Sequence, residues 1–90
     1  MKTFKVIIIG TVQGIFFRKF VKENADKLGV RGFVRNLEDG NLEIVVEGKD
    51  KEVLDLIEMC KKGPAHSNIK DVKVNEMSHQ GFDSFKISNL

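Results

Sequence analysis

The stretch GFVRNLEDGNLEIVVEG, residues 32–48, predicts a β-hairpin. Asp39-Gly40 favours a tight turn, because glycine readily adopts the positive φ that hairpin turns require. After the turn, Leu42, Ile44 and Val46 alternate with other residues, so they share one face of a strand. The strand before the turn is expected over residues 30–36. The middle of the chain is therefore predicted to be a pair of antiparallel strands.

A helix is predicted on each side of this hairpin. Before it, residues 18–28 place apolar side chains at the spacing of one helix face, and Gly29 suits a helix end. After it, Asp50 is a candidate N-cap, and residues 61–64 (KKGP) form a stop signal. The side chains expected to face inward are Val21, Ala25 and Leu28 in the first helix and Val53, Leu54, Ile57 and Cys60 in the second.

Three more strands complete the predicted order. Residues 1–9 begin with alternating apolar side chains and become apolar on both faces, as in a central strand. Residues 69–77 and 82–88 are the other two. The order β-α-β-β-α-β plus one strand predicts an α+β, ferredoxin-like split βαβ sandwich. Two helices would cover one face of an antiparallel or mixed sheet, with the C-terminal strand at an edge. We expect residues 1–90 to form a single domain.

Composition excludes several classes of function. The chain is 41% hydrophobic and 31% charged, which is typical of a soluble globular protein. Its net charge of +2, with both signs interleaved, does not favour nucleic-acid binding. No apolar run approaches the ~20 residues that span a bilayer, and the N-terminus lacks a signal-peptide pattern. The single cysteine, Cys60, forms no internal disulfide, which fits a reducing compartment. We therefore expect a cytoplasmic protein that binds neither nucleic acid nor membrane. We also expect it to be a monomer.

The stretch GTVQGIFFRKF, residues 10–20, carries an unexpected charge pattern. Arg18 and Lys19 begin the predicted helix, where the macrodipole is positive and each cation costs ~0.3–1 kcal/mol. Gly10 and Gly14 bracket a loop whose backbone N–H groups could point inward and bind an anion. A bound anion would explain Arg18, whose guanidinium suits phosphate oxygens. The alternative is that both cations are solvated surface residues.

Two stretches together resemble the acylphosphatase family. GTVQGIFFR (10–18) is similar to its G-x-V-Q-G-V-x-F-R loop, and GFVRNLEDG (32–40) to its G-[WF]-V-x-N-x-x-D-G strand and turn. The resemblance extends over essentially the whole chain, including CKKGP (60–64) and the terminal F-x-I strand. Three residues depart from the usual pattern without affecting its polar chemistry: Ile15, Phe33 and Ala65.

The resemblance implies a function and a set of site residues. Similar enzymes hydrolyse acyl phosphates to a carboxylate and inorganic phosphate, which is the product and an expected inhibitor. They use no metal or other cofactor and form no phosphoenzyme. The essential arginine and asparagine of the family correspond to Arg18 and Asn36. Its phosphate-binding loop corresponds to Gly10, Thr11, Val12, Gln13, Gly14, Ile15 and Phe16.

The chemistry is consistent with so few polar groups. A carboxylate whose conjugate acid has a pKa of about 4 leaves without a proton, so no general acid is needed. Asn36 is not a base, but its amide could orient a water molecule. Taken alone, an asparagine before a turn is more often a turn former. The acyl phosphates 1,3-bisphosphoglycerate, acetyl phosphate and carbamoyl phosphate would all fit a shallow site.

Other candidates are weaker. His66 and His79 have no further ligands at metal spacing, and Cys60 fits a core position. One of Phe16 and Phe17 is expected to pack beneath the loop and the other to border the acyl group. An RNA-binding module would need stacking aromatics that NLEIVVEG (41–48) lacks. A non-catalytic anion-sensing or regulatory ferredoxin-like domain is the remaining alternative, although a sensor has no use for an oriented water.

Overall fold

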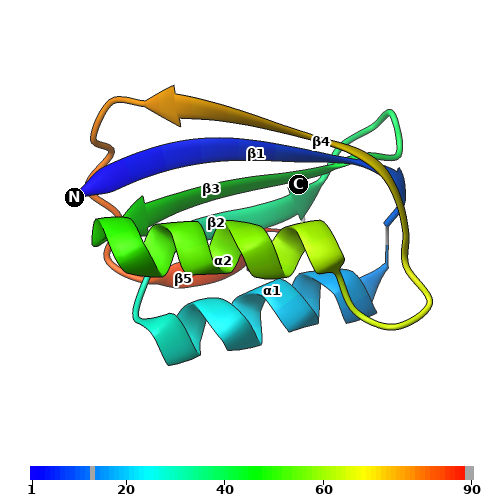
Figure 1. Ribbon diagram of the computed structural model, residues 1–90, viewed down its shortest axis with the longest axis horizontal. Helices are drawn as coiled ribbons and strands as arrows, with labels where there is room; N and C mark the ends of the chain where they lie inside the picture. Colours follow the sequence, from blue (N-terminus) through cyan, green and yellow to red (C-terminus); the bar gives the residue numbers. More distant parts are fainter. Residues whose placement is uncertain (13, 89–90) are drawn as a thin grey trace.

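The computed structural model describes residues 1–12 and 14–88, which form five strands and two helices (Figure 1). The predicted ferredoxin-like fold is confirmed, including the strand added after the second βαβ half. The elements are β1 (Lys2–Thr11), α1 (Ile15–Leu28), β2 (Arg31–Asn36), β3 (Leu42–Gly48), α2 (Asp50–Lys62), β4 (Asn68–Met77) and β5 (Phe85–Ser88).

The described strands lie in one mixed sheet in the order β4-β1-β3-β2-β5. Neighbouring strands are antiparallel, except that β5 pairs parallel with β2. The C-terminal strand is thus at an edge, as predicted, and its partner is the first strand of the hairpin. Both helices cover the same face of the sheet (Figure 1), α1 over β2 and β5 and α2 mainly over β1 and β3.

The hydrophobic core lies between the sheet and the helices. Cys60 is 1% exposed, which confirms its expected core position, and burial raises the pKa of its thiol to about 12. Leu54 was expected to face inward, but it is 52% exposed and Leu56 is buried instead. A residue lies about 100° around a helix from its neighbour, so Leu54 turns away from the face that Val53 and Ile57 share.

The first helix begins at Ile15, one turn earlier than the apolar spacing predicted. Phe17 is buried and extends the stripe of Val21 and Ala25 toward the N-terminus, which stabilises the additional turn. Arg18 is therefore the fourth helical residue, not the first. Because the macrodipole effect falls off within the first turn, the charge penalty at Arg18 is smaller than the sequence suggested.

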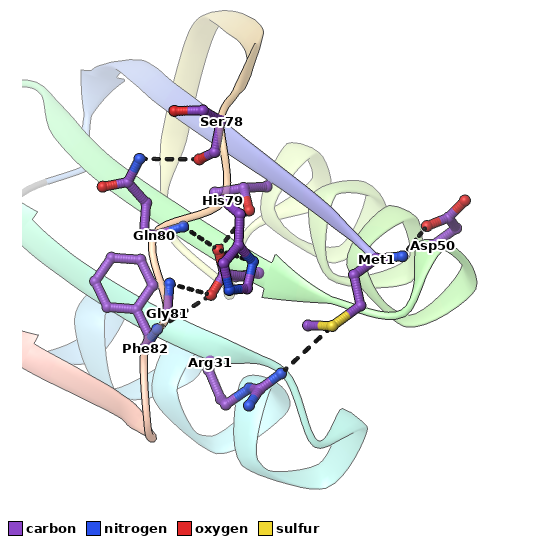
Figure 2. Close-up of polar contacts among 10 residues, drawn as sticks. Met1, Arg31, Asp50, Ser78, His79, Gln80, Gly81 and Phe82 are labelled. Atoms are coloured by element: carbon purple, nitrogen blue, oxygen red, sulfur yellow. Dashed lines mark hydrogen bonds and ion pairs between the residues drawn. The ribbon is translucent and has the colours of Figure 1, made fainter.

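The second helix is also capped differently from the prediction. Lys49 is the N-cap residue and Asp50 is the first residue of the helix, without a side-chain capping bond. The Asp50 carboxylate instead lies 3.5 Å from the N-terminal amine of Met1 (Figure 2). An acidic side chain in the first turn still complements the macrodipole.

Glu47 is a fully buried carboxylate on the sheet face opposite the helices. It accepts hydrogen bonds from the N–H groups of Gln80 (2.6 Å), Gly81 (2.9 Å) and Phe82 (3.1 Å), and from the hydroxyl of Thr3 (2.6 Å) (Figure 2). Burial alone would raise the pKa of Glu47, but these bonds outweigh it and lower the pKa from 4.5 to about 2. The carboxylate therefore fixes the β4–β5 connection over the sheet.

We expect Glu47→Gln to lower the free energy of unfolding by roughly 2–4 kcal/mol at pH 7, because buried N–H donors lose a charged acceptor. The pKa of Glu47 is lower in the folded state than the ordinary value of 4.5. Its contribution is therefore complete above about pH 4.5 and is lost as the pH falls toward 2. Urea unfolding at pH 7 and pH 3 measures both effects. Glu58→Gln, at an exposed position, is the control, and an acid dependence in Glu47→Gln equal to that of the wild type would contradict this assignment.

Candidate active site

Sheet topology brings the predicted site residues to one end of the sheet, where β1 and β2 terminate. Because β1 and β2 are both antiparallel to β3, they run in the same direction and terminate at the same end of the sheet. In the register, Ile8 pairs with Leu42, which pairs with Asn36. Asn36 is thus two strands, or roughly 10 Å, from β1 just before Gly10. The chain passes from β1 to α1 at this same end of the sheet (Figure 1).

The loop between β1 and α1 is shorter than the predicted strand (1–9) and helix (18–28) imply. Gly10 and Thr11 still belong to β1, while Ile15 and Phe16 already belong to α1. The predicted contribution of Gln13 lies outside the described residues. Val12 is 2% exposed, so its side chain packs in the core and anchors the loop there. Only the backbone of Val12 is available to contact a ligand.

Gly10 is required by the close approach of β4. Its φ is +145°, and an added Cβ would lie 2.1 Å from the carbonyl oxygen of Asn68. That distance is a severe clash with backbone, and the pairing of β1 with β4 shifts register at this point. The glycine therefore directs the chain from the sheet into the loop.

The beginning of α1 has no side-chain capping bond from its N-cap residue. Gly14 is the N-cap, with a φ of 114°, and it has no side chain to cap the helix. Within the described part of the chain, no acidic residue occupies the first turn. The first N–H groups of a helix lack intrahelical partners, and together with the macrodipole they form an anion-binding site.

Asn36 ends β2 with its side chain oriented inward. Its Oδ1 atom is buried and has no hydrogen-bond partner among residues 1–12 and 14–88. Leaving a buried acceptor unsatisfied costs about 1–3 kcal/mol, so the site needs a donor that the described residues do not supply. Arg18 is half-buried on α1, at the same edge of the sheet, and its Nε atom is buried.

The hairpin turn is closed by hydrogen bonds among residues 37–41. The N–H of Leu37 donates to the carbonyl of Asn41 (2.8 Å), and the N–H of Gly40 donates to Leu37 (3.2 Å). The carboxylate of Asp39 accepts from the N–H of Asn41 (3.0 Å). These bonds close the turn with residues 37–41, which weakens the interpretation of Asn36 as a turn former.

The two phenylalanines at the start of α1 have different environments. Phe17 is 3% exposed and meets Phe20 edge to face, with ring centroids 6.3 Å apart. Phe16 is 82% exposed. Phe17 is therefore the residue that packs beneath the loop, and Phe16 is available to a ligand.

A cleft of about 590 Å³ lies beside the loop. One wall consists of Thr11, Val12, Phe16 and Phe17, and the other of residues 64–67 in the α2–β4 connection. Sequence reasoning missed this second wall, because Gly63-Pro64 indicated only the end of a helix. Nothing in the local sequence reveals that the connection lies against α1.

Two further findings concern the described residues only. They contain no group of three or more His, Cys, Asp or Glu side chains placed to hold a metal ion. Neither α1 nor α2 is long and apolar enough to span a membrane.

His79 lies 3.3 Å from Glu47, near the end of the sheet opposite the loop.

Comparison with known proteins identifies the family. Residues 4–87 match the acylphosphatase family. The chain belongs to the acylphosphatase family. An acylphosphatase of Methanocella arvoryzae is 38% identical over 87 residues, covering 97% of this chain and 99% of the relative. One of Haloquadratum walsbyi is 44% identical over 82 residues, covering 91% and 88%. The crystal structure of acylphosphatase from Bacillus subtilis has a TM-score of 0.92 and 36% identity, covering 98% of this chain and 99% of that one.

Membership in this family settles the class of function. The protein is an acylphosphatase, a hydrolase that acts on acyl phosphates. The acylphosphatases of Methanocella arvoryzae and Bacillus subtilis are each matched over 99% of their length. A non-catalytic anion-sensing domain was the alternative interpretation of the sequence, and the family membership favours the enzyme over it.

Proposed function

We propose that a water molecule held by Asn36 attacks the phosphoryl group directly, while the loop and Arg18 bind that group. The observation that carries this proposal is the buried Oδ1 of Asn36, which has no hydrogen-bond partner among the described residues and lies at the end of the sheet where α1 begins. An acceptor in this position suits the O–H of a water molecule. The amide of Asn36 then orients the nucleophile without taking its proton.

The phosphoryl oxygens are bound by two kinds of donor. Backbone N–H groups of the loop and of the start of α1 donate to the anion. Arg18 adds a planar guanidinium that donates two parallel hydrogen bonds to phosphate oxygens. Both stabilise the charge that spreads over the equatorial oxygens in the transition state.

The leaving group needs no acid. The bond between phosphorus and the carboxyl oxygen breaks as water adds in line, and the carboxylate leaves with the bonding electrons. A nonbridging phosphate oxygen takes the proton of the attacking water, which gives inorganic phosphate. An alkyl phosphate would have to leave as a strongly basic alkoxide, so this site should hydrolyse such esters poorly. The proposed mechanism uses neither metal nor cofactor.

Inorganic phosphate should inhibit competitively and raise the melting temperature, because it binds the folded loop and not the unfolded chain. At 100 times its Kd the stabilisation is about 2.7 kcal/mol. For a chain of 90 residues this corresponds to an increase in Tm of roughly 14 °C. Initial rates with acetyl phosphate and a thermal scan measure the two effects.

Sodium chloride at matched ionic strength serves as the control for general salt effects. EDTA should change neither the rate nor the Tm. Inhibition by phosphate without a thermal shift would contradict the proposed site, and loss of activity in EDTA would contradict the metal-free mechanism.

A further inference from the structure

The proposed phosphate-binding loop begins where β1 pairs with the start of β4. Thr11 pairs with Asn68, the first residue of β4, and the neighbouring Gly10 pairs with Ile69. The two backbones are in close contact there, because a Cβ added at Gly10 would lie 2.1 Å from the carbonyl oxygen of Asn68. The start of β4 therefore determines where the chain leaves the sheet and where the N–H groups of the loop lie.

The connection between α2 and β4 also contacts the other end of this loop. Figure 1 shows the connection and the start of α1 at the same end of the molecule. A Cβ added at Gly63 would lie 3.3 Å from Cε2 of Phe17, the buried residue in the first turn of α1, and 2.9 Å from Cδ1 of Ile69. Residues 63–69 therefore pack against both ends of the phosphate-binding loop, and their position is coupled to that of the loop.

A tight turn, residues 64–67, leads from the end of α2 into β4. The hydroxyl of the half-buried Ser67 donates to the carbonyl oxygen of Pro64 (2.6 Å), and the backbone N–H of Ser67 donates to the same oxygen (3.3 Å). Between them, His66 has a φ of +69°, a left-handed conformation that glycine adopts more readily than a residue with a side chain. The hydroxyl of Ser67 therefore stabilises a turn whose backbone conformation is unfavourable for its own sequence.

We propose that Ser67 is a positioning residue of the enzyme, whose hydroxyl holds the 64–67 turn so that the start of β4 places the phosphate-binding loop correctly. The inference rests on the proposed function, because it requires the phosphoryl group to bind at the loop. In this role Ser67 acts through Asn68 and Gly10, and not through contact with the substrate. A displaced loop weakens phosphate binding, since hydrogen bonds weaken steeply as their distance and angle depart from the optimum.

The positioning role has a kinetic signature of its own. The N–H groups of the loop contact phosphate in both the ground and transition states, so their displacement raises KM and the inhibition constant of inorganic phosphate together and changes kcat little. A purely structural role gives another result, because a small unfolded fraction lowers the apparent kcat and leaves both constants unchanged. Contact between Ser67 and the acyl group would change KM alone, since inorganic phosphate has no acyl group.

The test measures kcat, KM for acetyl phosphate and the inhibition constant of inorganic phosphate, well below the melting temperature. In Ser67→Ala, KM and the inhibition constant should both rise roughly three- to tenfold, the factor that corresponds to one neutral hydrogen bond. Ser67→Thr retains the hydroxyl and should keep both constants close to the wild-type values. Ser78→Ala is the matched control and should change neither constant, because it removes an exposed serine hydroxyl just beyond the other end of β4.

The inhibition constant decides between the possible outcomes. A wild-type inhibition constant in Ser67→Ala, with phosphate still a competitive inhibitor of the wild type, would overturn the positioning role and leave the proposed function standing. A raised constant in Ser67→Thr equal to that in Ser67→Ala would also overturn it, because the hydroxyl would then not be the group that acts. Absence of phosphate inhibition in the wild type would overturn the proposed function itself, and the positioning role with it.

Discussion

Arg18→Lys should reduce acyl phosphate hydrolysis by about 10³-fold or more while the protein stays folded. Lysine keeps the positive charge, but it lacks the planar fork that donates two hydrogen bonds to one phosphate. In phosphoryl transfer, an arginine that stabilises the transition state contributes on the order of 10³–10⁵ in kcat. The measurement is kcat and KM with acetyl phosphate, accompanied by circular dichroism and a thermal scan.

Lys19→Ala is the matched control, since it removes the neighbouring exposed cation from the same turn of α1. If general positive charge near the helix start were sufficient, Lys19→Ala would lose activity and Arg18→Lys would not. Near-normal turnover and unchanged phosphate inhibition in Arg18→Lys would show that Arg18 does not bind the phosphoryl group. Arg18→Ala should damage phosphate binding and turnover together, because the guanidinium contacts phosphate in both the ground and transition states.

Asn36→Ala should lower kcat by roughly 10²–10³-fold and leave the inhibition constant of phosphate almost unchanged. The proposed role of Asn36 is to hold the attacking water, so its loss affects the transition state and not phosphate binding. The size is that of removing one preorganised hydrogen-bonding group from an active site, about 2.7–4 kcal/mol. Rates and phosphate inhibition curves measured together separate the two effects.

The melting temperature of Asn36→Ala provides an independent test of the same proposal. Asn36→Ala removes a buried acceptor with no hydrogen-bond partner among the described residues, so it should not lower the melting temperature. Asn41→Ala, which changes another asparagine of the hairpin and retains its backbone N–H, is the matched control for effects on the turn. Normal kcat in Asn36→Ala would show that another group positions the water. A lower melting temperature together with normal kcat would show that Asn36 is a turn former.

Both variants differ from Glu47→Gln in what they should change. Glu47 and its hydrogen bonds to residues 80–82 lie on the face opposite the helices, near the end of the sheet away from the loop. Its replacement should alter stability, especially toward acid, with little effect on kcat at neutral pH.

Much of the candidate site could be predicted from the sequence because its residues lie in two short stretches. The long loop signature and the Asn36 turn signature carried the resemblance, and the family they indicated is confirmed. The strand and the helix that flank the loop are longer than predicted, since β1 ends at Thr11 and α1 begins at Ile15. A motif identifies which residues take part, but strand pairing decides where a loop begins, and Gly10 and Thr11 pair with β4, far along the chain.

The sequence by itself determined the hairpin, the order of the elements and hence the fold class. Turn formation at Asp39-Gly40 and the alternation of Leu42, Ile44 and Val46 are local effects, which neighbouring residues settle among themselves. Helix stops and apolar spacing are local in the same sense.

Only the tertiary structure decided which of two similar residues is buried. Phe17 and Phe16 are adjacent and chemically identical, and packing against the core selects the first and leaves the second facing the cleft. The second wall of the cleft and the pairing of β5 with β2 are decided in the same way. Each depends on contacts between segments far apart in the sequence. The free energy of burying these surfaces against one another is gained only once the chain has folded.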